Sequence, residues 1–430
     1  MDNDQPIDVS PLKRTFSALQ HRDYRLYWVG MLISLVGTWM QIPAQSWLVQ
    51  ETASRIYHTT NTSLYQGIVN AAGSTPIFLL TLIGGVFADR YDKRIVLLIT
   101  QAAAMIVSTL FAIIAGWENL QIWHIISLSI FAGIFFAFDM PVRQSFAKDL
   151  VGPGDLMNAI SLNSFVFNLA RIIGPALAAP LLAMGTIFLW GFKVNSISLI
   201  YILNSISFLA VLIALWKISY RKKAPATRQS GVIAPLKEAL LYAAKDKPIR
   251  LLLILMSVVS LFGFSAFIPM PAFAVETLKT GAKGYAMLMS TFGAGSLAGI
   301  LLMASCGHLL PKGRQLFISG LTFSIPLILL SLCTHFVYAL ILIFFVGAGL
   351  VTSSATINSL IQYYAPEKLR GRIVGLWGFL FAGMSPIGSM FAGYIGHQFL
   401  PVTPFYIGGG ICLIALLIIT ITSNWLWRMD

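Results

Sequence analysis

The sequence predicts an all-α membrane protein with twelve transmembrane helices arranged as two six-helix pseudo-repeats. Its composition, a series of apolar segments and an internal repeat support this prediction. Charged residues make up 10% of the 430 residues, and the mean hydropathy is +0.79. Soluble domains average about 25% charged residues, so this chain must expose much of its apolar surface to lipid.

Twelve apolar segments follow one another along the chain, each close to the ~20 residues that cross a bilayer. We place them at 24–50, 62–88, 95–115, 121–146, 156–183, 194–217, 249–275, 284–307, 314–333, 335–363, 372–397 and 402–424. With this assignment, about 24 of the 29 Lys and Arg residues lie on the side of the N-terminus and about four on the other. We therefore expect both termini in the cytoplasm, in a multi-pass protein.

The polar segments divide the chain into two halves. Residues 1–23 have no apolar core or cleavage site of a signal peptide and are predicted to be a cytoplasmic tail. Two six-helix bundles, 24–217 and 249–424, flank a cytoplasmic linker at 218–248 with an amphipathic stretch at 235–244, and 425–430 form a second tail. The net charge of +13 arises from this loop asymmetry, so no nucleic-acid partner is expected.

The two halves repeat in sequence. Residues 34–43 align without gaps to residues 260–269, and Ser, Leu, Gly, Ile and Pro coincide. Parallel six-helix repeats place a binding site between the halves and transport by alternating access. One chain holds the whole unit, so a monomer is expected.

A charged loop joins the second and third apolar segments, so these form a hairpin with the charges at one membrane face. The stretch resembles the motif between the second and third helices of the major facilitator superfamily. Its matching residues are Gly85, Asp89, Arg90, Lys93 and Arg94, whereas Asp92 stands where the motif has glycine. The equivalent loop of the second half lacks the acid.

Further stretches resemble the bacterial drug and siderophore efflux branch of that superfamily, which includes the enterobactin exporter and macrolide efflux proteins. They are 16–25 leading into 37–41 and, later in the chain, 139–144, 149–151, 158–164 and 168–175. The resemblance extends to individual residues over 16–182, whereas the rest of the chain resembles this branch only in its arrangement of helices. It implies a proton-driven exporter of the bacterial inner membrane, with the proton gradient as energy source and no cofactor. Gly174 and Pro175 resemble the start of the antiporter motif, which continues here with Ala178 and Ala179 instead of glycines; close helix packing alone explains them equally well.

Asp139 and Arg143 form a candidate pair inside the fourth segment. A carboxylate at that depth is costly unless it is paired, and Arg143 lies one helical turn away. The resemblance implies that Asp139 joins Asp89, Arg90 and Arg94 in a charge network that locks the outward-open state and loosens on protonation. A purely structural ion-pair network remains the alternative.

Arg171 is the one basic residue well inside an apolar segment, roughly 22 Å from the segment's cytoplasmic end. Arginine keeps its proton and needs an acceptor or an anion. Helix carbonyls, Gln41, Gln45 or a substrate must serve, and Asn168 shares its helix face. The alternatives are a cavity-facing arginine that selects an anionic substrate and a buried structural strut.

Glu51 and Glu276 close the first and seventh segments on the side opposite the N-terminus. They are candidate outer proton sites, although solvated helix ends are the simpler explanation. Trp39, Trp47 and Trp377 are candidates to line a cavity for an aromatic substrate.

The leading hypothesis is a proton-coupled antiporter that exports an amphiphilic small molecule such as a siderophore or drug, with protons and membrane lipid as its other partners. A lipid flippase or an uptake transporter of the same fold is the alternative. From another class, a non-transporting sensor or assembly partner predicts a large soluble domain, whereas the longest loop here has about thirty residues. No spacing of nucleophile and base, metal ligands or phosphate loop suggests an enzyme or a metal site.

Overall fold

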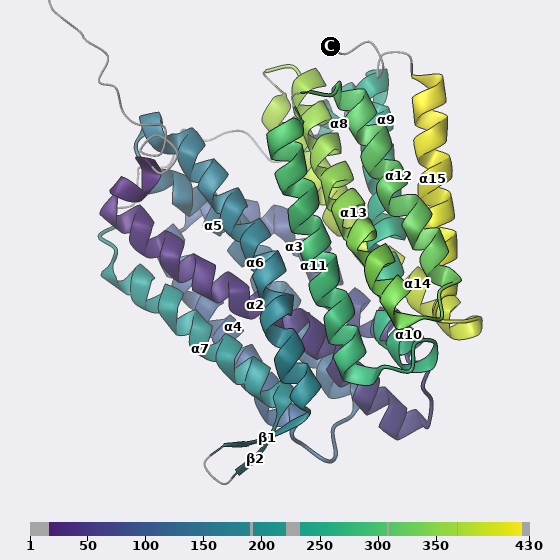
Figure 1. Cartoon of the computed structure of the whole chain (residues 1–430). Helices are drawn as coiled ribbons and strands as arrows, with labels where there is room; N and C mark the ends of the chain where they lie inside the picture. The colour runs from purple at the N-terminus through teal and green to yellow at the C-terminus, as the bar shows by residue number, and fades with distance from the viewer. Residues whose placement is uncertain (1–16, 190–191, 221–232, 308, 368, 424–430) are drawn as a thin grey trace, which may run out of the picture.

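The computed structural model describes residues 17–189, 192–220, 233–307, 309–367 and 369–423. The amino-terminal half consists of η1 (Ser17–Gln20), α2 (Arg22–Tyr57), α3 (Ser63–Arg90), α4 (Lys93–Ala115), α5 (Ile122–Asp149), η2 (Pro153–Asp155), α6 (Leu156–Met184), β1 (Thr186–Leu189), β2 (Phe192–Asn195) and α7 (Ser196–Lys217). Most of its helices lie on the left in Figure 1, in purple to teal. The predicted tails at 1–16 and 424–430 lie outside the described residues.

The carboxyl-terminal half lies on the right in Figure 1, mostly in green to yellow. It consists of α9 (Lys247–Val258), η3 (Val259–Phe264), η4 (Ser265–Phe267), α10 (Met270–Glu276), α11 (Gly281–Cys306), α12 (Lys312–Ser331), α13 (Phe336–Tyr364), α14 (Arg370–Gln398) and α15 (Thr403–Thr422). Each predicted apolar segment corresponds to a helix or helical run whose ends agree within a few residues, except that α2 continues to Tyr57. In the described part of the chain, eleven are long and apolar enough to cross a membrane, and α3, with 28 residues, occupies the remaining segment.

Lipid-facing surfaces confirm the membrane assignment. On α4, Ile99, Ile106 and Ile113 recur every seven residues and are 62%, 56% and 65% exposed. A spacing of seven residues returns to the same helix face, so α4 has an aliphatic stripe directed away from the bundle. Bare aliphatic surface of this kind is stable against acyl chains rather than water.

The seventh segment is one span made of unlike pieces. α9 passes into the π-helical turn η3 and the 3-10 turn η4 before α10 resumes. Pro269 and Pro271 remove backbone donors here and interrupt the regular ladder. Pro43 aligns with Pro269, yet α2 continues through it as a helix, so the sequence repeat does not extend to local geometry.

The linker contains a helix, α8 (Ile233–Lys245), where an amphipathic stretch was expected. Ala239 and Ala243 lie one turn apart and are buried, and Glu238 forms an ion pair with Arg372 of α14. α8 therefore packs against the carboxyl-terminal half.

A small hairpin was not predicted. β1 and β2 pair antiparallel, with Thr186 opposite Asn195, and project below α6 and α7 in Figure 1. Gly185 enters the hairpin with a φ of +66° and accepts a hydrogen bond from the Ser196 amide at 2.8 Å. Its residues lie almost entirely in the stretch 184–193, the loop between the predicted fifth and sixth segments. We call this end of the molecule the hairpin face, and the opposite end, where α2 begins and α3 ends, the basic face.

The two halves meet along two helix pairs, α3 with α14 and α6 with α11. Near the hairpin face, a Cβ atom on Gly67 would lie 2.9 Å from the Cα of Gly393, so the backbones of α3 and α14 are in direct contact. Asn61 Nδ2 donates to the Gly396 carbonyl at 2.8 Å, and Ser389 Oγ donates to Asn70 Oδ1 at 2.9 Å. We call this line of contact between the halves the seam.

The start of the chain is anchored at the basic face. The Ala18 amide donates to Asn158 at 3.0 Å, and His21 Nε2 lies 2.8 Å from Asp155 Oδ2. Hydrogen bonds from Ser17 and His21 hold the pKa of the Asp155 carboxyl below its usual value.

This lowered pKa has a consequence for stability. Because the folded state binds the Asp155 proton less well than the unfolded state, the stabilisation is complete at neutral pH and is lost as the pH falls below the usual carboxyl range. We expect Asp155→Asn to lower the thermal midpoint slightly at pH 7, with the difference vanishing near pH 3. Melting both proteins across this range tests it, and a difference independent of pH would contradict it.

Candidate functional site

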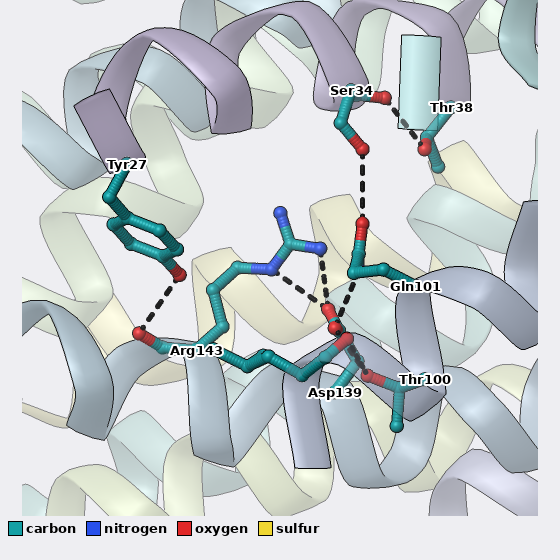
Figure 2. Close-up of polar contacts among 8 residues, drawn as sticks. Tyr27, Ser34, Thr38, Thr100, Gln101, Asp139 and Arg143 are labelled. Carbon is teal, nitrogen blue, oxygen red and sulfur yellow. Dashed lines mark hydrogen bonds and ion pairs between the residues drawn. The ribbon is translucent and has the colours of Figure 1, made fainter. Parts of the chain in front are cut away.

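A buried polar network surrounds Asp139 in the amino-terminal half (Figure 2). Arg143 donates from Nε at 2.8 Å and approaches the same oxygen, Oδ2, from Nη2 at 2.6 Å. Thr100 Oγ1 and Gln101 Nε2 of α4 donate to the other oxygen, Oδ1, at 3.0 and 2.6 Å. Four donor atoms therefore satisfy this carboxylate, as a buried charge requires.

The network continues into α2. Ser34 Oγ donates to Gln101 Oε1 at 3.3 Å, and the Tyr27 hydroxyl donates to the backbone carbonyl of Arg143 at 3.4 Å. Because Ser34, Gln101 and Asp139 are all buried, the network links α2, α4 and α5 through polar contacts that water does not replace. Nη1 of Arg143 is buried and has no hydrogen-bond partner among the described residues.

The charged loop at the basic face forms separate contacts. Lys93 Nζ lies 2.7 Å from Asp149, which also accepts from the Tyr220 hydroxyl at 3.0 Å. Arg94 donates to the Leu215 and Trp216 carbonyls at the end of α7, at 2.7 and 2.8 Å, instead of joining Asp139. Carbonyls at a helix C-terminus lack intrahelical partners, which explains why they bind this guanidinium.

The departure from the family motif at Asp92 has a local explanation. The Asp92 carboxylate caps α4, accepting hydrogen bonds from the amides of Arg94 and Ile95 at 2.9 and 3.2 Å. The backbone at Asp92 has a φ of −67°, so this position does not require glycine. Arg90 is exposed at the end of α3, while the side chain of Asp89 lies outside the description. The predicted network of Asp89, Arg90, Arg94 and Asp139 therefore stays a prediction, except that Arg94 is not part of it here.

Gly84, next to the motif glycine Gly85, packs against α5, where a Cβ atom would lie 2.5 Å from the Ala137 carbonyl oxygen. A Cβ atom on Gly85 would meet nothing within 4 Å. The close helix contact at this point of α3 therefore depends on Gly84 and not on the motif glycine.

Arg171 lies at the middle of α6 among aromatic rings. Its Cζ atom is 4.9 Å from the centre of the Trp39 ring and 5.8 Å from that of Phe167. Among the described residues it has no carboxylate partner within ion-pair distance. A guanidinium over an indole face is stabilised by cation–π attraction, which leaves the hydrogen-bond donors of the group available.

The predicted amide partners of Arg171 lie elsewhere. Gln41 accepts from Asn204 of α7, and Gln45 donates to Ser129 of α5 at 2.8 Å. Both amides join helices within the amino-terminal half, so neither is a hydrogen-bond partner of Arg171 in this arrangement. Asn168 lies in α6, and its side chain is outside the description.

α6 holds Arg171 beside the seam. A Cβ atom on Gly174 would lie 2.5 Å from Trp39 Cβ, so α6 and α2 are in close contact there. On the neighbouring face of α6, the Pro175 carbonyl accepts from Ser290 of α11 at 3.4 Å, and Ile172 lies against Gly293 of α11. Gly174 and Pro175 thus contact both halves, one turn from Arg171.

Glu51 and Glu276 both lie at the hairpin face but have different partners. Glu51 accepts from Trp47 Nε1 at 2.6 Å within α2. Glu276 accepts from Thr60 Oγ1 across the seam at 2.6 Å. Trp47 also crosses the seam, stacking on Tyr285 with ring centres 6.0 Å apart.

Sequence reasoning missed several members of these clusters. Thr100 and Gln101 are adjacent polar residues inside an apolar segment, a signal that could have marked them. Asp149 and Tyr220 carry no comparable signal, because both lie near segment ends where polar residues are common.

Two six-helix halves that meet along a seam, with a lone guanidinium at mid-membrane beside it, are the features of a polytopic membrane transporter. The chain belongs to the family described as transmembrane secretion effector, within the major facilitator superfamily, whose family model matches residues 13–427. The predicted family and fold are thereby confirmed.

The chain is 25% identical to the staphyloferrin A transporter of Staphylococcus aureus, over 90% of this chain and 92% of that one. It is 22% identical to the enterobactin exporter EntS of Salmonella typhi (94% and 93%) and 22% identical to the multidrug efflux pump Tap of Mycolicibacterium fortuitum (83% and 85%).

Solved structures share the fold. The POT family transporter PepTSo has a TM-score of 0.73 at 12% identity, covering 95% of this chain and 99% of its own. A bacterial homolog of the human lysosomal transporter Spinster, inward-facing and unoccupied, has a TM-score of 0.68 at 12% identity, covering 94% and 96%.

Proposed function

We propose that this protein is a proton-coupled antiporter that exports an anionic, amphiphilic small molecule across the bacterial inner membrane. The single observation that supports it most is Arg171, a permanent positive charge at mid-membrane, held by aromatic rings beside the seam without a carboxylate partner among the described residues. A charge at that depth is costly, and residues of this kind usually mark a substrate or ion pathway. Relatives named for staphyloferrin A, enterobactin and drugs support a siderophore or drug as substrate.

The contacts between the halves support the proposed alternating access. The backbone contact of Gly67 with Gly393, the Thr60–Glu276 hydrogen bond and the Trp47–Tyr285 stack all lie toward the hairpin face. The positive-inside pattern assigns that face to the periplasm. We infer an inward-facing state, with substrate reaching Arg171 from the cytoplasm.

Proton coupling is assigned to carboxylates whose partners change during the cycle. The Asp139 carboxylate accepts hydrogen bonds from Arg143, Thr100 and Gln101 in this state. In the proposed cycle it takes a proton only after the network opens, and Glu276 at the seam is a second acceptor. Transport in exchange for protons then needs no cofactor.

The test uses inside-out vesicles acidified inside, with a labelled siderophore and a lipophilic cation as parallel substrates. We expect siderophore uptake that a protonophore abolishes and that Arg171→Ala lowers by at least about tenfold, equivalent to 1.4 kcal/mol. Arg171→Lys keeps the charge but loses the planar donors, so we expect partial activity.

Arg25→Ala is the matched control because it removes an exposed arginine of α2 near the basic face. Size-exclusion elution and melting temperature check that each variant is folded. Uptake of the cation alone, unaffected by Arg171→Ala, would contradict the anion-selecting role. Failure of the gradient to drive either substrate would refute proton-coupled export of these classes.

A further inference from the structure

A cavity of about 430 Å³ opens at the hairpin face, within the amino-terminal half. It lies between the end of α2, the end of α4 with the following loop, and the β1–β2 hairpin. Its polar and aromatic lining includes Glu51, Thr52, Arg55, Trp117, Glu118 and Thr186. Because they all belong to one half, this cavity is separate from the seam and from Arg171.

Three charged side chains line the cavity, and none forms an ion pair with another described residue within 4 Å. The Arg55 guanidinium donates to the Leu120 carbonyl at 2.7 Å, which holds it against the loop. Glu51 is oriented by the Trp47 indole at 2.6 Å through one oxygen. Two carboxylates, from Glu51 and Glu118, thus share the cavity with one cation, Arg55.

The remaining lining suits an organic cation. Trp117 is 50% exposed beside Glu118 and offers an indole face, which attracts ammonium groups. The Thr52 and Thr186 hydroxyls add acceptors for N–H donors. The volume falls within the ~300–1,000 Å³ typical of small-molecule sites.

We propose that this cavity binds the ammonium group of an organic amine, between the carboxylates of Glu51 and Glu118 and the face of Trp117. The site is independent of the proposed transport function, because it does not include the seam. The ammonium has two sources, a free polyamine or the ethanolamine headgroup of a phospholipid, and both present the same N–H donors to the carboxylates.

The test is calorimetric titration of spermidine into the purified full chain in detergent. We expect saturable binding that weakens by at least about tenfold in Glu51→Gln and in Glu118→Gln, since each removes one carboxylate charge. Glu367→Gln is the matched control because it removes an exposed carboxylate at the opposite face. Arg55→Gln should bind as well as or better than the unaltered chain.

Binding unchanged in both cavity variants, or absent in the unaltered chain, would overturn the proposal. Succinate binding that Arg55→Gln abolishes would overturn it too, because it would make the cavity an anion site. Nanodiscs of two lipid compositions separate the two sources. If the ethanolamine headgroup occupies the cavity, spermidine binds more weakly in phosphatidylethanolamine than in phosphatidylglycerol. If a free amine occupies it, spermidine binds equally well in both.

Discussion

Alanine at Gly67 is expected to reduce transport strongly while leaving each half folded. Its Cβ atom would lie 2.6 Å from the Ser389 carbonyl oxygen and 2.9 Å from Gly393 Cα, both backbone atoms of α14 that no side-chain rotation can move aside. Overpacking of this kind costs about 1–3 kcal/mol. The clash exists only when the halves meet at the hairpin face. It therefore destabilises that conformation alone and lowers its population by roughly 5- to 150-fold.

Spin-label distances test this expectation directly. Labels at Asn119 and Phe399, both exposed at the hairpin face in different halves, should move apart in Gly67→Ala. Gly410→Ala is the control, because a Cβ atom there meets nothing within 4 Å. Unchanged distances together with normal transport would show that the backbone contact between α3 and α14 is not needed.

Asparagine at Asp139 is expected to lower the free energy of unfolding by about 3–5 kcal/mol, the usual cost of breaking a buried pair. The amide has nearly the same shape but no charge, so Arg143 would be left as an uncompensated buried cation. The amide nitrogen of the asparagine would also be a donor where the carboxylate oxygen was an acceptor, so it would face the donors of α4 or of Arg143 without a hydrogen bond. The transport rate of Asp139→Asn should fall together with its stability, because the Asp139 carboxylate joins α4 to α5.

A double variant separates the charge effect from packing. Asp139→Asn with Arg143→Met removes both charges, and we expect it to unfold at a higher temperature than Asp139→Asn alone. Asp155→Asn breaks a half-buried pair with His21 outside the membrane-spanning helices, and should change stability by less than about 1 kcal/mol. Equal losses in Asp139→Asn and Asp155→Asn would contradict the buried-pair account.

Local sequence determined the membrane class and the spans. Twenty-residue apolar runs fold as helices in lipid because their backbone groups have no other partners there, so the predicted segments agree with the helices from α2 to α15. The Asp139–Arg143 pair was predictable for a similar reason, since an i,i+4 contact depends only on helix geometry. The β1–β2 hairpin was missed because its strands have only four residues each and fill the short loop between two predicted segments, where so brief a run gives little strand signal.

Contacts between helices were decided by the tertiary structure. Gln41 and Arg171 both stand out as polar residues in apolar segments, but only packing shows that Gln41 binds Asn204 and that Arg171 lies over Trp39. The cavity of Glu51 and Glu118 likewise joins residues about 67 positions apart in sequence. Hydropathy and charge therefore determined where this chain crosses the membrane, whereas which buried polar groups meet depended on helix rotation and register, which no single segment specifies.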